Sequence, residues 1–570
     1  MTLTDKKQIC NDSRFIFLLV VLGIGVNIKY IFTDLCIDST YQISMAYRIV
    51  EGDLLFRDMW EVHQTSAFLC AIFIKLYLYL FKTTTGIVIF IQCMSVLFDG
   101  AISYLIYKIV FKYDVEKNIA FFMAWVFFVV SPKDVPIAEF ANMQIWFSML
   151  LCLMLFLYDR TKKKLFIILA ALSLCLTILS YPSSIIIFPA IIILFIYYKQ
   201  WKEILIFAGV CLITGALYLG NILRYIKVDR LIETIESMLS IEPTHTVKLS
   251  DKFLYYAYDF VKYAIVLLVF YLISYVIVYF ICKAKPRYIA VKKILTDVFY
   301  CLIMGLVSLY SVIDYKNYPR GFYSLSFVAI ILVGIMHKNK IKENVRGLYL
   351  YGNLIAIMNM FATLLLTDLE LITVIPYLIV AVIVALLPLS EIFKELNLTL
   401  NIKIYKYFAI ILFIVLLVFK GVFIIRPMYQ WIAPITDVRG MVKDGPAKGY
   451  ISEYMGPYIQ NETMKEWEEY VQEGDKIYLI GSAIDTLPYL YEDTIIVAPT
   501  VMSTPAYGES IAKYWEYNSE KYPDVVIAAC WFGELDTVLM NNEWIMEWLE
   551  EDFKPAYYID GKYWRYYFRE

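Results

Sequence analysis

The chain has little charge, little proline and glycine, and very few histidines. Asp, Glu, Lys and Arg make up 18% of its 570 residues, beside 23 glycines, 18 prolines and 3 histidines. So little Pro and Gly excludes a fibrous or disordered chain. A net charge of −2 excludes bulk binding to nucleic acid.

Cysteine motifs and a cleavage site are also missing. The 10 cysteines contain no C-x-x-C pair and lie mostly in apolar segments, which is typical of small core residues rather than of disulfides or a zinc site. No small-residue cleavage site follows the first apolar run. The basic residues before that run, Lys6, Lys7 and Arg14, therefore indicate a retained signal anchor.

Apolar residues dominate what is present. They make up 61% of the chain, and apolar runs of about 17 to 25 residues recur along it. Because backbone groups in lipid must bond internally, each run predicts a membrane-spanning helix. The chain is therefore predicted to be an all-α polytopic bundle of thirteen spans. These are residues 15–33, 86–108, 119–132, 140–158, 165–180, 184–198, 204–221, 263–281, 294–313, 322–336, 347–366, 371–389 and 407–425.

The basic residues of the short loops predict the orientation of this bundle. Lys and Arg stay on the cytoplasmic side, and they gather at the N-terminus and in every second loop. The alternate short loops carry only Lys133, Lys316 and Arg320. We therefore predict a cytoplasmic N-terminus, with outer loops at 34–85 and 222–262. The basic loops are 108–117, 160–164, 199–202, 283–293, 337–346 and 394–406.

This orientation requires that one apolar run, 66–81, does not cross the bilayer. Lys75 lies in its middle, where a charge costs roughly 2.5 to 3.5 kcal/mol on insertion scales. An interfacial or re-entrant helix is therefore the prediction. The alternative is a hairpin of 66–81 with 86–108, which would invert every later loop.

The composition changes after residue 425. Residues 1–425 are predicted to form the transmembrane domain, and residues 426–570 a small extracytoplasmic α/β domain. Turn residues return there, and short apolar strands at 476–483, 494–499 and 524–530 alternate with helical patterns at 510–522 and 542–551. GSAIDT after the first strand is not a dinucleotide-binding motif. The many Tyr and Trp residues suit sugar stacking, contact with the bilayer, or an aromatic core.

The segment 33–66 is the polar exception in the first half of the chain. It carries Asp34, Asp38, Glu51, Asp53, Asp58 and Glu61 directly after the first apolar run. Helical spacing of its apolar residues from Ile43 to Val50 predicts a helix on the membrane surface. Asp38 lies near the start of that helix, so it is either an active carboxylate or a helix cap. Asp34 is either the second candidate for the catalytic carboxylate or a solvated boundary residue at the end of the first helix. His63 is a lone histidine of structural type.

The segment IDSTYQISMAYRIVEGDLLFRDMWEVHQTSAF resembles the first outer loop of GT-C glycosyltransferases. That group includes protein mannosyltransferases, lipid A aminoarabinose transferases and the bacterial RgtA/B/C/D-like enzymes. Ser39 stands where Glu is common, and Gln64 and Thr65 stand where prolines are usual. The residues that match the family pattern are Asp38, Tyr41, Arg48, Glu51, Gly52, Phe56, Asp58 and His63.

Two further outer loops match the family by position. Glu139 lies at the outer mouth of a helix where relatives carry an acidic residue, and Asp134 is the competing candidate. Pro319 and Arg320 resemble the P-R-Y element of such enzymes, although Gly321 replaces the Tyr. Arg320 is either functional or an anchor for lipid phosphate.

The resemblance implies transfer of a sugar from a polyprenyl-phosphate donor to a cell-envelope glycan, lipid or protein at the outer face of a bacterial plasma membrane. It implies Asp38 as base, with Glu139 orienting the acceptor, and inversion at the anomeric carbon. Arg320, helped by Lys252 or Lys262, would neutralise the departing phosphate. Tyr41, Arg48, Asp58 and His63 would contact substrate.

Several alternatives stay open at this point. One is a glycan polymerase or ligase with a diphosphate donor. Another is a non-enzymatic glycolipid transporter, for which Asp99 in the second span is the clearest pathway residue, unless it joins helices as a buried polar contact. The resemblance implies no required cofactor. Asp34 and Asp38 could ligate a divalent ion, so the metal is left unknown.

Overall fold

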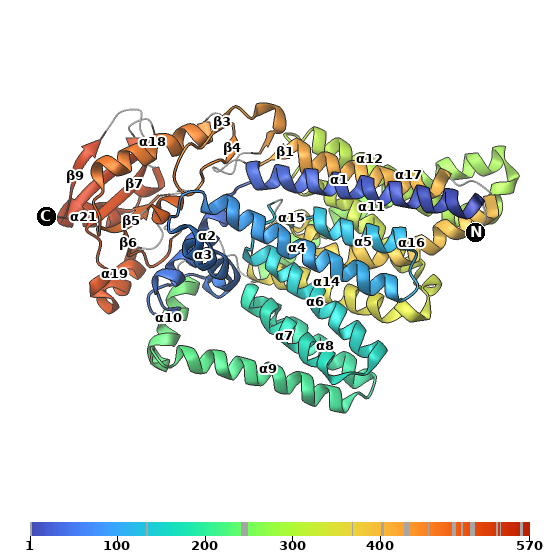
Figure 1. The fold of residues 1–570 in the computed structure, drawn as a ribbon, viewed down its shortest axis with the longest axis horizontal. Coiled ribbons are helices and arrows are strands. Elements are labelled where there is room, and N and C mark those ends of the chain that lie inside the picture. The colour runs from blue at the N-terminus through green and yellow to red at the C-terminus, as the bar shows by residue number, and fades with distance from the viewer. Residues whose placement is uncertain are drawn as a thin grey trace.

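The computed structural model shows a helical bundle with a smaller sheet-containing domain at one end (Figure 1). The N-terminal end of α1 lies at the far end of the bundle from the C-terminal domain (Figure 1). The structure describes residues 3–132, 135–240, 249–367, 369–400, 404–426, 432–453, 455–481, 486–491, 494–501, 508–531, 534–535, 537–558 and 563–569.

Each of the thirteen predicted spans falls on a helix. Within the described residues, 9 helices are long and apolar enough to cross a membrane, and the other apolar helices are shorter. The chain is thus a membrane-type helical protein, while the count of thirteen crossings stays a prediction. The bundle helices are α1 (Leu3–Thr33), α4 (Ile87–Lys112), α5 (Lys117–Val129), α6 (Phe140–Thr161), α7 (Lys164–Ser180), α8 (Ile187–Tyr197), α9 (Trp201–Ile222), α11 (Leu249–Ala284), α12 (Lys292–Ile313), α13 (Leu325–Met336), α14 (Arg346–Leu366), α16 (Ile379–Leu400) and α17 (Ile404–Phe423).

Helices α6 and α16 form the centre of the bundle, and glycines set how closely their neighbours approach. A Cβ on Gly352 of α14 would lie 2.6 Å from a methyl carbon of Val384, and one on Gly334 of α13 would lie 2.9 Å from the Cβ of Ala385. Small residues at such contacts let backbones pack closely where lipid removes the hydrophobic driving force.

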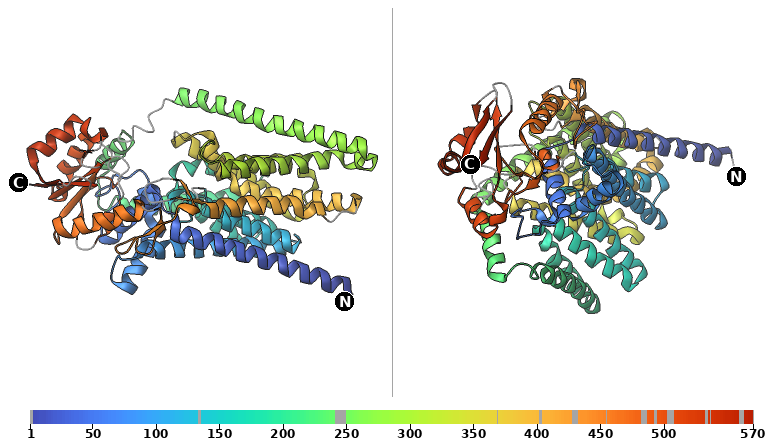
Figure 2. Two further views of the ribbon diagram at one scale, coloured as in Figure 1. Left: turned by 90° about the horizontal axis from the view of Figure 1, so that it is seen from above. Right: turned by 60° about the vertical axis from the view of Figure 1, so that its left-hand side comes forward.

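The two segments predicted to lie at the membrane surface, the helix around 43–50 and the run 66–81, are at the end of the bundle that adjoins the C-terminal domain. Helix α2 (Ile37–Glu51) packs on α3 (Phe68–Phe81), which follows the 3-10 turn η1 (Gln64–Ala67). Figure 2 shows α3 at that end, across the direction of the bundle helices. The stretch 64–81 nevertheless meets the length and apolarity of a span, so its interfacial placement stays a prediction. Lys75, the reason for that prediction, is exposed.

The C-terminal region contains one mixed sheet in the order β6-β5-β7-β10-β9. The three strands predicted from sequence are β5 (Lys476–Ile480), β6 (Ile495–Ile496) and β7 (Val525–Trp531), and β5 runs parallel to both others. The sheet also contains the antiparallel pair β9 (Phe553–Tyr558) and β10 (Trp564–Arg569). This pair was not predicted, because the Tyr and Trp residues of the terminal sequence also suit a binding surface. The other α-helices and strands are α10 (Val228–Ser240), α15 (Leu371–Val374), α18 (Met455–Tyr470), α19 (Gly508–Tyr517), α20 (Thr537–Met540), α21 (Glu543–Asp552), β1 (Ile424–Ile425), β2 (Ala433–Pro434), β3 (Gly440–Met441), β4 (Ile451–Ser452) and β8 (Glu534–Leu535). Three of the further 3-10 turns are η2 (Pro182–Ile186), η5 (Phe322–Ser324) and η8 (Ile375–Leu378).

Many of the aromatic residues of this region pack on one another. The ring centroids of Trp515 and Trp548 lie 4.9 Å apart, those of Tyr478 and Trp515 lie 5.7 Å apart, and those of Trp548 and Phe553 lie 5.0 Å apart. These rings therefore form an aromatic core, which was one of the three predicted uses of the Tyr and Trp residues.

Candidate active site

The backbone before α2 is fastened to the end of α17. The amide of Leu35 donates to the carbonyl of Arg426 at 2.8 Å. The Tyr450 hydroxyl donates to the carbonyls of Thr33 at 2.8 Å and Arg426 at 2.9 Å. Residue 426 is thereby placed beside the start of the acidic loop, although almost 400 residues separate the two in sequence.

Asp38 lies in the first turn of α2 and is half-buried. The N-cap of this helix is Cys36, two residues earlier, so Asp38 is not the cap residue. A carboxylate in the first turn is still favoured by the free N–H groups and the helix dipole. The position thus combines partial access with a backbone environment that favours the charged form.

Glu139 is the N-cap of α6. Its carboxylate accepts a hydrogen bond from the amide of Asn142 at 3.3 Å, and its side chain is almost fully buried. Asn142 donates in turn to the carbonyls of Val135 at 2.6 Å and Ile137 at 2.8 Å. The loop before α6 is therefore folded onto the helix start and fixes Glu139 there. Asp134, the competing candidate, lies outside the described residues.

The two carboxylates and Arg426 share one electrostatic environment. The charges of Asp38, Glu139 and Arg426 all act on the buried thiol of Cys36 and on the buried hydroxyl of Tyr377 in η8. Burial raises the pKa of the Cys36 thiol, and Asp38 raises it further, whereas Arg426 lowers it. Asp38, Glu139 and Arg426 thus act on the same two buried side chains, although they belong to α2, the start of α6 and the segment after α17.

Asp34 belongs to a separate, structural contact. Its carboxylate pairs with the Lys29 ammonium at 2.7 Å and accepts a hydrogen bond from the Thr33 hydroxyl at 2.6 Å. Lys29 also donates to the carbonyl of Ile424. Asp34 therefore pairs with the ammonium of Lys29, and Lys29 in turn joins α1 to the strand that follows α17. Among the described residues, no group of three or more His, Cys, Asp and Glu side chains gathers as metal ligands would.

Arg48 lies in the joint between the acidic loop and the C-terminal domain. Its buried guanidinium pairs with Asp53 at 2.7 Å and Glu61 at 3.6 Å. Glu61 accepts hydrogen bonds from the Thr500 hydroxyl at 2.6 Å and the Val501 amide at 2.5 Å. Burial raises the pKa of Glu61, while Arg48 and these hydrogen bonds oppose that rise.

Tyr41 and Asp58 belong to the same joint. Tyr41 makes a side-chain hydrogen bond with Glu61. The carboxylate of Asp58 accepts from the Leu54 amide at 2.8 Å, and its carbonyl accepts from the Tyr514 hydroxyl at 2.8 Å. Three of the predicted substrate contacts, Tyr41, Arg48 and Asp58, are thus placed at an interface within the protein.

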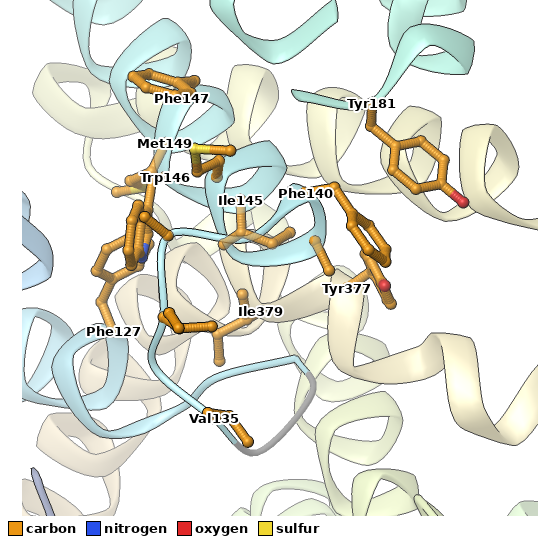
Figure 3. Packing of buried hydrophobic residues seen from close by; sticks show 14 of the residues in the cluster. Phe127, Val135, Phe140, Ile145, Trp146, Phe147, Met149, Tyr181, Tyr377 and Ile379 are labelled. Atoms are coloured by element: carbon orange, nitrogen blue, oxygen red, sulfur yellow. The ribbon is translucent and has the colours of Figure 1, made fainter. Parts of the chain in front are cut away.

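His63 links the acidic loop to the start of α6. Its ring stacks on Phe140, the residue after Glu139, with ring centroids 4.1 Å apart and an interplanar angle of 6°. Figure 3 shows Phe140 in one buried cluster with Tyr181 and Tyr377. His63 also lines an apolar cavity of about 580 Å³ between α7, α9 and α10, which we call the α7–α9 groove.

A second apolar cavity of about 510 Å³ lies between α11 and α13, and we call it the α11–α13 groove. Ile375 and Leu378 of η8 line it, so the turn that carries Tyr377 also forms its wall. Each of the two grooves is therefore lined by residues next to the candidate site. The α11–α13 groove is lined by η8, which carries Tyr377, and the α7–α9 groove is lined by His63, which stacks on Phe140.

Two of the three predicted phosphate-binding cations are close in sequence to residues that line the α11–α13 groove. Arg320 is exposed in the loop just before Leu325, which lines it. Lys262 is exposed and lies over the ring of Tyr263, another lining residue. Lys252 is buried, and its ammonium lies 3.4 Å from the carbonyl of Thr367 at the end of α14.

Gly321 explains the departure from the family's P-R-Y element. Its φ is +87°, and a Cβ there would lie 2.7 Å from the carbonyl oxygen of Ile372. A side chain would meet backbone at this point and would also strain the local conformation. A Tyr at this position therefore does not fit the loop as it is folded here.

Asp99 forms a contact between helices. It is buried in α4, and the indole N–H of Trp146 in α6 donates a hydrogen bond to it. This is the helix-joining role that was one of its two predicted readings.

Arg426 and Tyr377 are the site residues that the sequence did not reveal. Arg426 is a single cation after the last apolar run, which composition marks only as a domain boundary. Tyr377 is one aromatic among many in an apolar segment.

Comparison with known proteins does not identify a family. No family model matches the chain, and no curated protein matches it.

Proposed function

We propose that this protein is an integral membrane glycosyltransferase that moves a sugar from a polyprenyl-phosphate donor to a cell-envelope acceptor. The reaction takes place at the outer face of a bacterial plasma membrane. The observation that carries the proposal is that the charges of Asp38, Glu139 and Arg426 all act on the same two buried side chains, Cys36 and Tyr377. Two carboxylates and one guanidinium that share an electrostatic environment suit proton removal next to a developing phosphate charge.

Each of these groups has a definite part in the transfer. Asp38 takes the proton of the acceptor hydroxyl, whose oxygen forms a bond to the anomeric carbon. The bond from that carbon to the lipid phosphate breaks, and the phosphate leaves with the electron pair. Glu139 orients the acceptor, and Arg426 stabilises negative charge in the site. Direct attack inverts the anomeric configuration.

The α11–α13 groove suits the hydrocarbon chain of the donor. Its wall is apolar, and Arg320 and Lys262 lie near it on the side that is outer in the predicted orientation. A guanidinium fork matches phosphate oxygens in two hydrogen bonds. The donor phosphate would then lie between Arg320 and η8, with its sugar directed towards Asp38.

A donor competition experiment tests the proposal. The purified protein in lipid nanodiscs is incubated with polyprenyl monophosphates and diphosphates that carry a panel of hexoses and pentoses. We expect consumption of a monophosphate donor, with release of polyprenyl monophosphate and an inverted product. Preference for the diphosphate would favour a polymerase or ligase, and no turnover of any donor would contradict the proposal.

The substitution Asp99→Asn distinguishes the glycosyltransferase proposal from the alternative of a glycolipid transporter. The Asn side-chain carbonyl can still accept the Trp146 hydrogen bond, and such contacts are worth about 0.6 kcal/mol on average within membranes. We therefore expect sugar transfer to stay within about twofold of the parent protein. A transporter that uses Asp99 as a pathway carboxylate would instead lose glycolipid movement, measured as transbilayer flux in proteoliposomes.

A further inference from the structure

We propose that the α7–α9 groove binds the hydrocarbon chain of the acceptor, so that the acceptor is a lipid with an anionic headgroup. This rests on the proposed function, because it assigns the second groove to the second substrate. The groove is linked to Glu139 through the stack of His63, which lines it, on Phe140, the residue after Glu139. An acceptor chain held there would bring its headgroup to the two carboxylates.

The outer part of this groove is built by the acidic loop and α10. Phe56 lines it with a φ of +63°, a left-handed conformation that is strained for a large side chain. The Phe56 amide donates to the side chain of Gln64 at 2.8 Å, and the Gln64 amide group reaches the sulfur of Met238 in α10 at 3.5 Å. These contacts hold the loop and α10 together over the cavity.

The acidic loop is also bonded to α7 at this groove. Gln64 and Thr65 both line the cavity. The Thr65 hydroxyl donates to the carbonyl of Leu179 in α7 at 2.7 Å. The groove wall is therefore tied to α7 as well as to α10.

Unpaired cations follow directly after α9. Arg224 and Lys227 lie in the turn between α9 and α10, the two helices that line the outer part of the groove. Both are exposed, and neither forms an ion pair with any residue that the structure describes. Arg230, next along the chain, is instead bonded to Asn518 at 3.1 Å. An anionic headgroup above the groove would meet Arg224 and Lys227.

Two glycines of α9 provide a test and its matched control. Gly215 lines the groove, whereas Gly209 lies on the same helix but does not, and a Cβ on either would meet nothing within 4 Å. The full chain in phosphatidylcholine nanodiscs is photolabelled with phosphatidic acid that carries a diazirine in its acyl chain. We expect labelling of the groove-lining peptides of α7 and α9 to fall about tenfold in Gly215→Trp and to stay unchanged in Gly209→Trp.

Two further probes identify the occupant. A diazirine diacylglycerol, which lacks the phosphate, should label the groove several-fold less than phosphatidic acid. The double variant Arg224→Gln with Lys227→Gln should remove that difference. A diazirine polyprenyl phosphate should label the α11–α13 groove in both glycine variants. Labelling of the α7–α9 groove by polyprenyl phosphate, blocked by Gly215→Trp, would overturn the assignment.

The photolabelling does not depend on turnover. Asp38→Asn should retain the labelling pattern even where it stops sugar transfer, so the groove and the proposed activity can fail separately. Phosphatidic acid labelling that is no stronger in the groove than on the lipid-facing side of α9 would overturn the inference. It would leave the proposed reaction standing.

Discussion

Asp38→Asn should lower the rate of sugar transfer by about 10²- to 10⁴-fold, the range typical of a lost general base. Asn has the same shape but cannot take the acceptor proton. The helix start should persist, because Cys36 rather than Asp38 is the N-cap of α2. Transfer is measured in a membrane preparation, with the amount of folded protein determined by size-exclusion chromatography.

Asp34→Asn is the matched control for this experiment. It makes the same chemical change four residues away, but Asp34 is paired with Lys29 at 2.7 Å, the residue that joins α1 to Ile424. Its loss should therefore reduce stability, because it leaves the Lys29 charge buried without its partner. Transfer per folded molecule should fall much less than for Asp38→Asn. Equal transfer by Asp38→Asn and the parent protein would remove Asp38 from the mechanism.

The helices of the bundle could be predicted from the sequence, because a membrane-spanning helix is recognisable from the length and the apolar composition of its segment alone. All thirteen predicted spans fall on helices, and β5, β6 and β7 coincide with the predicted strands. The hairpin of β9 and β10 was not foreseen, since its Tyr and Trp residues suit a binding surface as well as a strand. These residues form a strand because β10 pairs with β7, and that long-range pairing cannot be read from the local sequence.

The candidate site was predictable only in part. Asp38 and Glu139 stand out because they are acidic residues at the ends of apolar runs. Arg426 does not, because its place beside the start of the acidic loop depends on hydrogen bonds from Leu35 and Tyr450 to its carbonyl. These bonds join segments almost 400 residues apart, and spacing along the chain carries no signal of them. The family pattern alone also cannot separate a substrate contact from a buried ion pair, as Arg48 illustrates.

Arg48→Ala should destabilise the joint between the acidic loop and the C-terminal domain by about 3 to 5 kcal/mol. Removing one partner of a buried ion pair leaves an uncompensated charge. That charge would be on Glu61, which is fully buried and 3.6 Å from Arg48. The midpoint of thermal unfolding, followed by tryptophan fluorescence, and the rate of proteolytic release of the C-terminal domain should both report the loss.

The pH dependence and two further variants make this prediction specific. Burial already raises the pKa of Glu61, and without Arg48 the pKa should rise further. The loss of unfolding free energy in Arg48→Ala should therefore shrink as the pH falls through the folded-state pKa of Glu61, because the neutral carboxyl tolerates burial. Adding Glu61→Gln to Arg48→Ala should restore part of the stability for the same reason. Arg57→Ala removes a neighbouring pair with Asp58 whose arginine is 38% exposed, so it should cost only about 0 to 1 kcal/mol. A raised KM with unchanged unfolding in Arg48→Ala would instead make Arg48 a substrate contact, as the family pattern implied.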